Sequence, residues 1–256
     1  MPGENRTKIL REAEKHVLQG RIPLAIAEYL KIIKSDPNDV FILNTVGDLY
    51  LRLGKVLDAS KYFSQVAEHY VRNNFLLKAI AVYRKLLNAD PRNLDVNRTL
   101  ASLYAKQGLN VEARNQYMRV AELCANEGKT RESVEAYEKV AEMDPSNSAV
   151  HTKLAEIYLA EGSKEKAQCY FAAAGRAQSK SGDPVALISF GRAMQLNPVD
   201  KEVMKSFLDA SIQLGDVVPA LEQLKKSLVM VPRDPAFQEM LGRAYIAAKD
   251  PENAAK

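Results

Sequence analysis

A single pattern of small, aromatic and proline residues returns every 54 residues along this chain. Its first copy runs through Gly47, Tyr50, Gly54, Ala59, Phe63, Val66, Ala67, Tyr83 and Pro91. Its second copy runs through Ala101, Tyr104, Gly108, Ala113, Tyr117, Val120, Ala121, Tyr137 and Pro145. In a third copy, which opens at Ala155, one residue is lost and the closing pair moves to Phe190 and Pro198. Because residues of several chemical kinds keep one phase, the chain is predicted to be a repeat protein.

Each copy reads as three helices. Apolar residues recur at helical spacing, and glycines or Asp-Pro and Asn-Pro pairs interrupt them. A left-handed glycine ends a helix readily, and proline stops one because it lacks an N–H. The sequence therefore predicts an all-α fold, with helices near 39–53, 56–73 and 75–89 in the first full copy. The turns between them are short, which makes neighbouring helices antiparallel.

Two registers of a shorter pattern fit inside each copy. Counted from residue 40, positions 8, 11, 20 and 24 hold Gly47, Tyr50, Ala59 and Phe63. Counted from residue 60, the same positions hold Ala67, Tyr70, Ala79 and Tyr83. Both registers resemble the tetratricopeptide repeat (TPR), a helix pair of about 34 residues. Two such repeats fit into 54 residues only if they share about 14. We therefore interpret the middle helix as common to two overlapping repeats. After Pro198 the spacing to Pro232 is an ordinary 34 residues.

The resemblance covers nearly the whole chain and implies an α-solenoid, a right-handed superhelix of about 14 antiparallel helices. We expect one array over residues 1–256, with units at about 4–39, 40–93, 94–147, 148–200, 201–234 and an incomplete 235–256. The sequence stops at Lys256, inside an expected second helix that contains Ala254. We expect one of two explanations. Either the sequence comes from a longer parent protein, or its uncapped C-terminal end docks on a partner or on a second copy of the chain. Some segments are also similar to long bacterial members of the family.

In the family, partner segments often lie along first helices, at positions 2, 5, 9, 12 and 13. The resemblance thus implies a partner-binding set of Asn44, Asp48, Leu51, Arg52, Arg98, Ser102, Lys106, Thr152, Glu156, Lys205 and Asp209. The expected role is a non-enzymatic scaffold or adaptor that binds a peptide or helix of a partner protein. The tryptophan common at position 4 is absent, and the residues there are Leu43, Asn97, His151, Met204 and Gln238.

Two alternatives remain open. Chaperone-adapter members of the family hold a C-terminal carboxylate with a clamp of Lys, Asn and Arg, to which only Asn44 and Arg98 distantly correspond. A nucleic-acid-binding helical repeat is suggested by an isoelectric point of about 8.9. Such a protein needs cations aligned on one face. Arg98 and Lys106, however, are replaced by Thr152 and Ala160 one copy later. The net charge of +4, with both signs mixed, also makes nucleic acid the weaker reading.

The sequence offers no catalytic chemistry. His16, His69 and His151 are the only histidines, and none has a partner at the spacing of a catalytic triad or a metal site. We therefore expect no enzyme activity, no cofactor and no metal. Cys124 and Cys169 are predicted to be small buried residues in a reducing, cytoplasmic compartment. No apolar stretch is long enough to span a membrane, so we expect no insertion.

Overall fold

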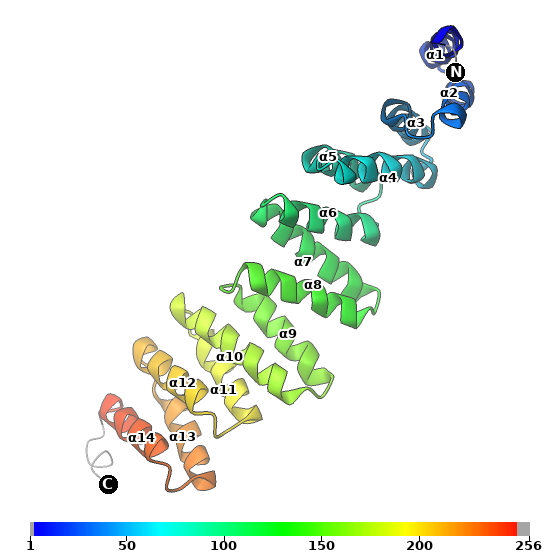
Figure 1. Ribbon diagram of the computed structural model, residues 1–256. Coiled ribbons are helices and arrows are strands. Elements are labelled where there is room, and N and C mark those ends of the chain that lie inside the picture. The colour runs from blue at the N-terminus through cyan, green and yellow to red at the C-terminus, as the bar shows by residue number, and fades with distance from the viewer. Residues whose placement is uncertain (1–2, 250–256) are drawn as a thin grey trace. The chain divides into compact units, whose positions relative to one another are not determined.

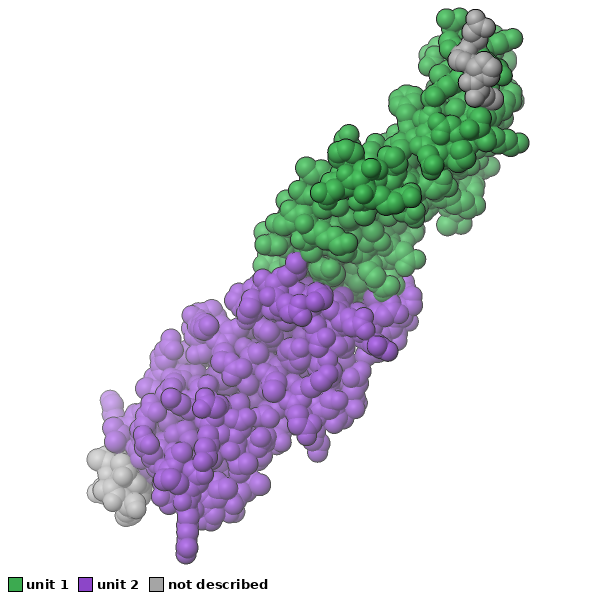
Figure 2. All heavy atoms as spheres, in the orientation of Figure 1, with its two compact units in different colours: residues 1–123 green, residues 124–256 purple. Residues whose placement is uncertain are grey.

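The computed structural model describes residues 3–249, and all regular secondary structure within them is helical. Fourteen α-helices follow one another in this range, which confirms the predicted fold class and number of helices (Figure 1). The helices form two compact units, Met1–Leu123 and Cys124–Lys256 (Figure 2). The single array predicted for residues 1–256 stays a prediction.

Unit 1 is a stack of helices in which each packs on the next. Its helices are α1 (Gly3–Leu18), α2 (Ile22–Ser35), α3 (Val40–Arg52), α4 (Val56–Arg72), α5 (Leu76–Ala89), α6 (Leu94–Lys106) and α7 (Asn110–Asn126), inside which the unit ends. Contacts join successive helices from α1 to α6. Short turns reverse the chain between them, so unit 1 has the antiparallel packing of an α-solenoid (Figure 1).

Unit 2 has the same construction. Its helices are α8 (Thr130–Met143), α9 (Ser148–Ala160), α10 (Lys164–Lys180), α11 (Val185–Leu196), α12 (Lys201–Leu214), α13 (Val218–Met230) and α14 (Pro235–Ala247). Successive helices are in contact, and α10 with α12, α11 with α13 and α12 with α14 are in contact as well. The second helix expected near Ala254 lies outside the described residues.

The helices that open the last five predicted units share one kind of N-terminal cap. In each, a side-chain oxygen of Asp or Asn accepts a hydrogen bond of 3.0–3.2 Å from a backbone N–H of the first turn. Such a cap contributes about 1 kcal/mol to stability. The capping residues are Asp39, Asn93, Asn147, Asp200 and Asp234. The starts of α3, α6 and α9, at residues 40, 94 and 148, keep the 54-residue spacing. Their interpretation as overlapping repeats stays a prediction.

Position 4, where the family commonly has tryptophan, has a structural role in three of the repeats. The side-chain nitrogens of Asn97, His151 and Gln238 lie 3.0–3.2 Å from the carbonyl oxygen of the proline six residues earlier. Each pair ties the turn before a first helix to that helix. In the other two repeats the position is apolar and buried, as Leu43 and Met204.

The small residues at fixed positions let helices approach closely. A Cβ added to Gly47 would lie 2.9 Å from the ring of Phe63, so α3 and α4 approach each other very closely at this residue. The equivalent aromatic side chains differ in burial, since Phe171 is buried and Tyr117 is half-buried. The other small residues of the pattern are also buried: Ala59, Ala67, Ala113, Ala121, Ala167 and Gly175.

The two cysteines have different environments. Cys124 is buried, as predicted, whereas Cys169 is exposed, so the prediction for Cys169 is wrong. The reason lies in the orientation of α10. Its buried face runs through Ala167, Gln168 and Phe171, which turns the side chain of residue 169 toward solvent.

Candidate functional site

Helix α3 of unit 1 contributes residues to the lining of two separate hollows. The first hollow, of about 430 Å³, lies among α1, α2 and α3. Its lining is largely apolar, with charged residues at its edge, and consists of Glu14, Val17, Leu18, Tyr29, Thr45, Asp48, Leu49 and Arg52. It contains two predicted site residues, Asp48 and Arg52.

The second hollow, which we call the α3–α5 groove, has a volume of about 490 Å³ and is formed by α3, α4 and α5. Its lining combines aromatic, aliphatic and basic side chains: Val40, Phe41, Asn44, His69, Tyr70, Lys78, Ala81, Val82 and Lys85. Phe41 is 71% exposed although it is aromatic, while Val82 in the floor is buried. An exposed aromatic side chain beside an apolar floor is the kind of feature that anchors a partner protein.

The cations of the α3–α5 groove are held in two ways. The ammonium of Lys85 lies 3.0 Å from both carboxylate oxygens of Asp48 and 3.5 Å from Oδ1 of Asn44. The ammonium of Lys78 lies 5.0 Å from the ring centroid of Phe75 and 5.7 Å from that of Tyr70. The first cation is therefore neutralised by a carboxylate, and the second rests against aromatic rings.

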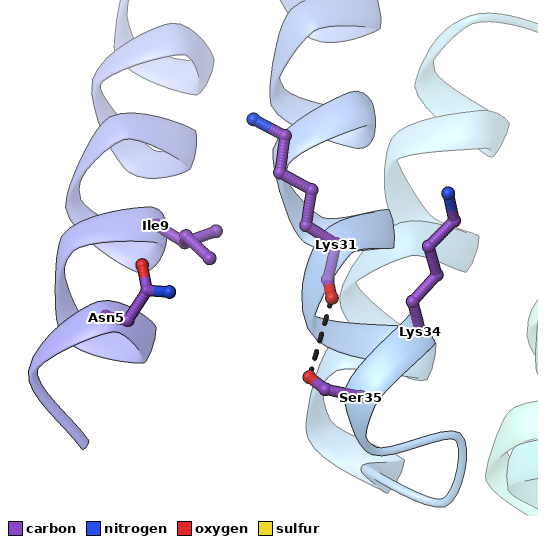
Figure 3. A pocket seen from close by; sticks show the side chains of 5 residues that line it. All are labelled: Asn5, Ile9, Lys31, Lys34 and Ser35. Atoms are coloured by element: carbon purple, nitrogen blue, oxygen red, sulfur yellow. Dashed lines mark hydrogen bonds between the residues drawn. The ribbon is translucent and has the colours of Figure 1, made fainter. Parts of the chain in front are cut away.

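A third hollow, of about 480 Å³, lies between α1 and α2 (Figure 3). Asn5 and Ile9 point from α1 toward α2, on which Lys31, Lys34 and Ser35 complete the lining. Lys31 already bonds Glu28 at 2.6 Å, and the Ser35 hydroxyl donates to backbone carbonyls of its own helix. The polar groups are thus engaged locally and do not converge on one point.

The predicted site residues are spread over four first helices. Asn44 lies in the α3–α5 groove, and Leu51 packs half-buried against the core around Phe63. The others that point to solvent wholly or in part lie on α6, α9 and α12: Arg98, Ser102, Lys106, Thr152, Glu156, Lys205 and Asp209. The structure thus brings Asn44, Asp48 and Arg52 to one helix with a hollow on either side. Partner binding by the full set stays a prediction.

Three of the predicted acids are already paired with cations. Within the units, carboxylate-to-cation distances are 3.0 Å for Asp48–Lys85, 3.3 Å for Glu156–Arg192 and 2.8 Å for Asp209–Arg243. Each pair joins a first helix to the helix two places later in the chain, and all six side chains are partly exposed. Such pairs contribute only about 0–1 kcal/mol each. A partner could therefore displace them at low cost.

Reasoning from the sequence missed most of the α3–α5 groove, because it followed first helices alone. Tyr70, Lys78 and Lys85 come from α4 and α5, so only packing brings them beside α3. A signal was available for Phe41, which occupies position 2 in the register counted from residue 40. A second signal was the composition of α5, which has basic residues and no acidic ones.

The described residues hold neither a metal-binding group of side chains nor a membrane-spanning helix. Within residues 3–249, no three His, Cys, Asp or Glu side chains are grouped so that they could hold a metal ion. In the same range, none of the helices has both the length and the apolar character needed to cross a membrane.

Models of the tetratricopeptide repeat match residues 67–127 and 125–189 of the sequence. These stretches include Tyr70, Tyr83, Tyr104 and Tyr137, which belong to the pattern described above. The chain is a tetratricopeptide-repeat protein. As a TPR protein, it has the general character of a protein-interaction scaffold.

Solved structures add little to this. A crystal structure of MamA is 18% identical over 74% of this chain and 88% of its own, with a TM-score of 0.25. The P58(IPK) TPR domain is 13% identical over 98% and 90%, with a TM-score of 0.24. The C-terminal part of a TPR repeat-containing protein from Cytophaga hutchinsonii is 15% identical over 91% and 99%, with a TM-score of 0.27. TM-scores this low support no further argument. No curated protein matches the sequence of this TPR protein.

Proposed function

We propose that this TPR protein is a non-enzymatic scaffold that holds a segment of a partner protein against α3, in the α3–α5 groove. The observation behind the proposal is the exposed ring of Phe41 at the edge of a hollow with an apolar floor. Interfaces gain most of their affinity from a few anchor residues, and aromatic side chains are enriched at interfaces.

The shape of the site favours a peptide or helix as the occupant. A hollow of about 490 Å³ is large enough for a few side chains but small for a folded domain. Asn44 also lines the groove. Its amide donates one N–H to Asp48 at 3.2 Å, and its second N–H suits a carbonyl of a bound segment. The first hollow on the other side of α3 would extend such a contact past Asp48 and Arg52.

Photo-crosslinking tests this proposal. Benzoylphenylalanine would replace Phe41 in the tagged chain, which is then exposed to lysate, irradiated and analysed by mass spectrometry. The matched control carries the same group in place of Leu57, an exposed apolar residue of α4 that does not line the groove. We expect crosslinks to a defined partner segment from position 41 and few from position 57. Equal labelling from both positions, or none from position 41, would contradict the proposal.

Self-association through the C-terminal end is part of the same proposal. Exposed apolar side chains on the last two described helices, Val229, Met230 and Ile246, support it. Sedimentation velocity over a range of concentrations should show a mass that rises with concentration, and substitution of Met230 by Ser should reduce this rise. A constant monomer mass would remove self-association from the proposal. Residence in the cytoplasm and a bacterial source stay predictions.

A further inference from the structure

We propose that the α3–α5 groove takes an acidic segment, in which an apolar side chain sits against Phe41 and a neighbouring Asp or Glu pairs with Lys78. This inference rests on the proposed function and adds the chemistry of the partner. It places the receptor for the carboxylate on α5 and not on the first-helix residues that the resemblance indicates.

The charge balance of α5 is the first argument. Helix α5 has three cationic residues, Lys78, Arg84 and Lys85, and no carboxylate. Asp48 of α3 neutralises Lys85 with both of its oxygens. In the described chain, the ammonium of Lys78 meets the rings of Tyr70 and Phe75 and no carboxylate. The groove therefore has an excess of positive charge at Lys78, which an anionic group of a partner would offset.

The position of Lys78 is the second argument. The aromatic rings beside it limit where its long side chain lies, so less conformational entropy remains to be lost when a carboxylate binds. Lys78 also lines the same hollow as Phe41, Ala81 and Val82. An apolar side chain on those residues would thus bring an adjacent carboxylate within reach of the ammonium.

The same features disfavour a basic segment and nucleic acid. A basic segment would be repelled by Lys78, and the described lining of the groove contains no carboxylate that could attract it. Asp48, which lines the first hollow, is already bonded to Lys85. Nucleic acid binds through several phosphates and needs a row of cations. In the lining of the groove, Lys78 is the cation without a carboxylate partner, and it lies beside the apolar residues Phe41, Ala81 and Val82. This arrangement suits one carboxylate better than a phosphate backbone.

Peptide binding by the full chain tests the inference. Fluorescently labelled short peptides would share one central Leu and Phe and differ only in whether Glu, Gln or Lys flanks them. Fluorescence anisotropy then gives their affinities at low and high salt, with a single-stranded RNA oligonucleotide as a further probe. We expect the Glu peptide to bind most tightly and to weaken as salt screens the pair.

Variants of α5 identify the receptor. Lys78→Glu should weaken the Glu peptide about tenfold, from the lost attraction and the new repulsion together. It should also shift the preference to the Lys peptide. Arg84→Glu makes the same charge change on an exposed residue of the same helix that does not line the groove, so its effect should be small. Phe41→Ser should weaken all the peptides about tenfold. Unchanged circular dichroism and melting would show that the variants are folded.

Each remaining result would overturn the inference. Equal affinities of the Glu and Gln peptides would show that the groove does not recognise a carboxylate. Equal effects of Lys78→Glu and Arg84→Glu would show that Lys78 is not the residue that binds it. Preference for RNA would reassign the groove to nucleic acid. Binding of none of the peptides would refute an acidic segment, whereas crosslinking at position 41 would still decide separately whether the groove holds a partner.

Discussion

Residues 40–89 of unit 1 and residues 148–196 of unit 2 have the same framework. In both, two tyrosine rings stack, with centroid distances of 5.5 Å for Tyr50–Tyr62 and 5.6 Å for Tyr158–Tyr170. In both, a cation lies over a buried phenylalanine, as Lys85 does over Phe63 at 5.5 Å and Arg192 over Phe171 at 4.0 Å. An acid of the first helix pairs with that cation in each region.

The surfaces on this framework differ. The residues equivalent to Phe41, Tyr70 and Lys78 are Ala149, Gln178 and Val185. Gln178 is buried and accepts a hydrogen bond of 2.7 Å from Ser189, which takes the place of Val82. The polar pair in residues 148–196 is therefore engaged internally, while the equivalent positions in residues 40–89 line an aromatic and basic groove.

The comparison separates two kinds of position. Those that hold helices together keep their chemistry over 108 residues of separation, because every unit faces the same packing requirement. Those that line the groove change. The exposed Phe41 becomes Ala149 because no packing requirement restrains it, whereas the buried Val82 becomes Ser189, whose hydroxyl is satisfied by Gln178. In a repeat protein, exposed positions that differ from the repeat pattern thus indicate the surface that determines which partner binds.

The largest expected effect tests the shared core. Phe171→Ala should lower the free energy of unfolding by about 3–5 kcal/mol, because it leaves a cavity beneath Arg192. Phe63→Ala should have a similar effect in residues 40–89. Urea denaturation measures both. A loss below about 1 kcal/mol at either site would show that the frameworks are not equivalent.

An intermediate effect is expected where the two regions differ by one methyl group. A Cβ added to Gly175 would lie 2.9 Å from the ring of Phe190, at the base of that ring, where the side chain has little freedom to move. Gly175→Ala should therefore cost about 1–3 kcal/mol through overpacking. Ala67 already has this methyl group at the equivalent position beside α5, and Ala67→Gly should cost about 1 kcal/mol. Thermal melting should show that both variants are less stable than the wild type. A Gly175→Ala variant that melts at a higher temperature than the wild type would refute the expected overpacking.

The smallest expected effect concerns the stacked tyrosines. The hydroxyl of Tyr158 donates to Glu138 at 2.7 Å, and Tyr170 donates to the same oxygen at 3.2 Å. Burial, followed by the hydrogen bond to Glu138 and its charge, raises the pKa of Tyr158 to about 12. Tyr158→Phe should lower stability by about 1 kcal/mol near neutral pH.

The dependence on pH follows from the sign of that shift. The folded state holds the phenol proton more tightly than the unfolded state, whose pKa is near 10. The stabilisation by Tyr158 is therefore complete below about pH 10 and is lost as pH rises from about 10 to about 12. Unfolding measured over this range should show a shrinking difference between the wild type and Tyr158→Phe. A difference that stays constant for Tyr158→Phe over this range would contradict the assignment.

Several features of the fold were predictable because they depend on local chemistry. Proline and left-handed glycine end helices wherever they stand, so Gly54, Gly108 and Gly162 marked the helix ends and have positive φ. The side-chain caps are equally local, since Asp39 or Asn93 needs only its own first turn. The burial of Cys169 was predicted wrongly, because the face of a helix that is buried depends on its neighbours.

The candidate site was predictable only in part. Asn44 was found from its place on a first helix, and it does line the α3–α5 groove. Lys78, however, is 34 residues away in the sequence, and no periodic pattern distinguishes it from Arg84 on the same helix. The packing of α5 makes that distinction, since it turns Lys78 into the groove and leaves Arg84 outside its lining.

The sequence by itself therefore determined that the chain is an all-α repeat protein, where its helices begin and end, and which small residues lie between them. These properties arise from interactions within one helix or one turn, and the repeat multiplies the signal. Only the tertiary structure decided which side chains share a hollow, which acids are already paired and, among the described residues, that Lys78 of the groove has no carboxylate partner. Those properties depend on distances between helices, and a pattern along the chain contains no such distances.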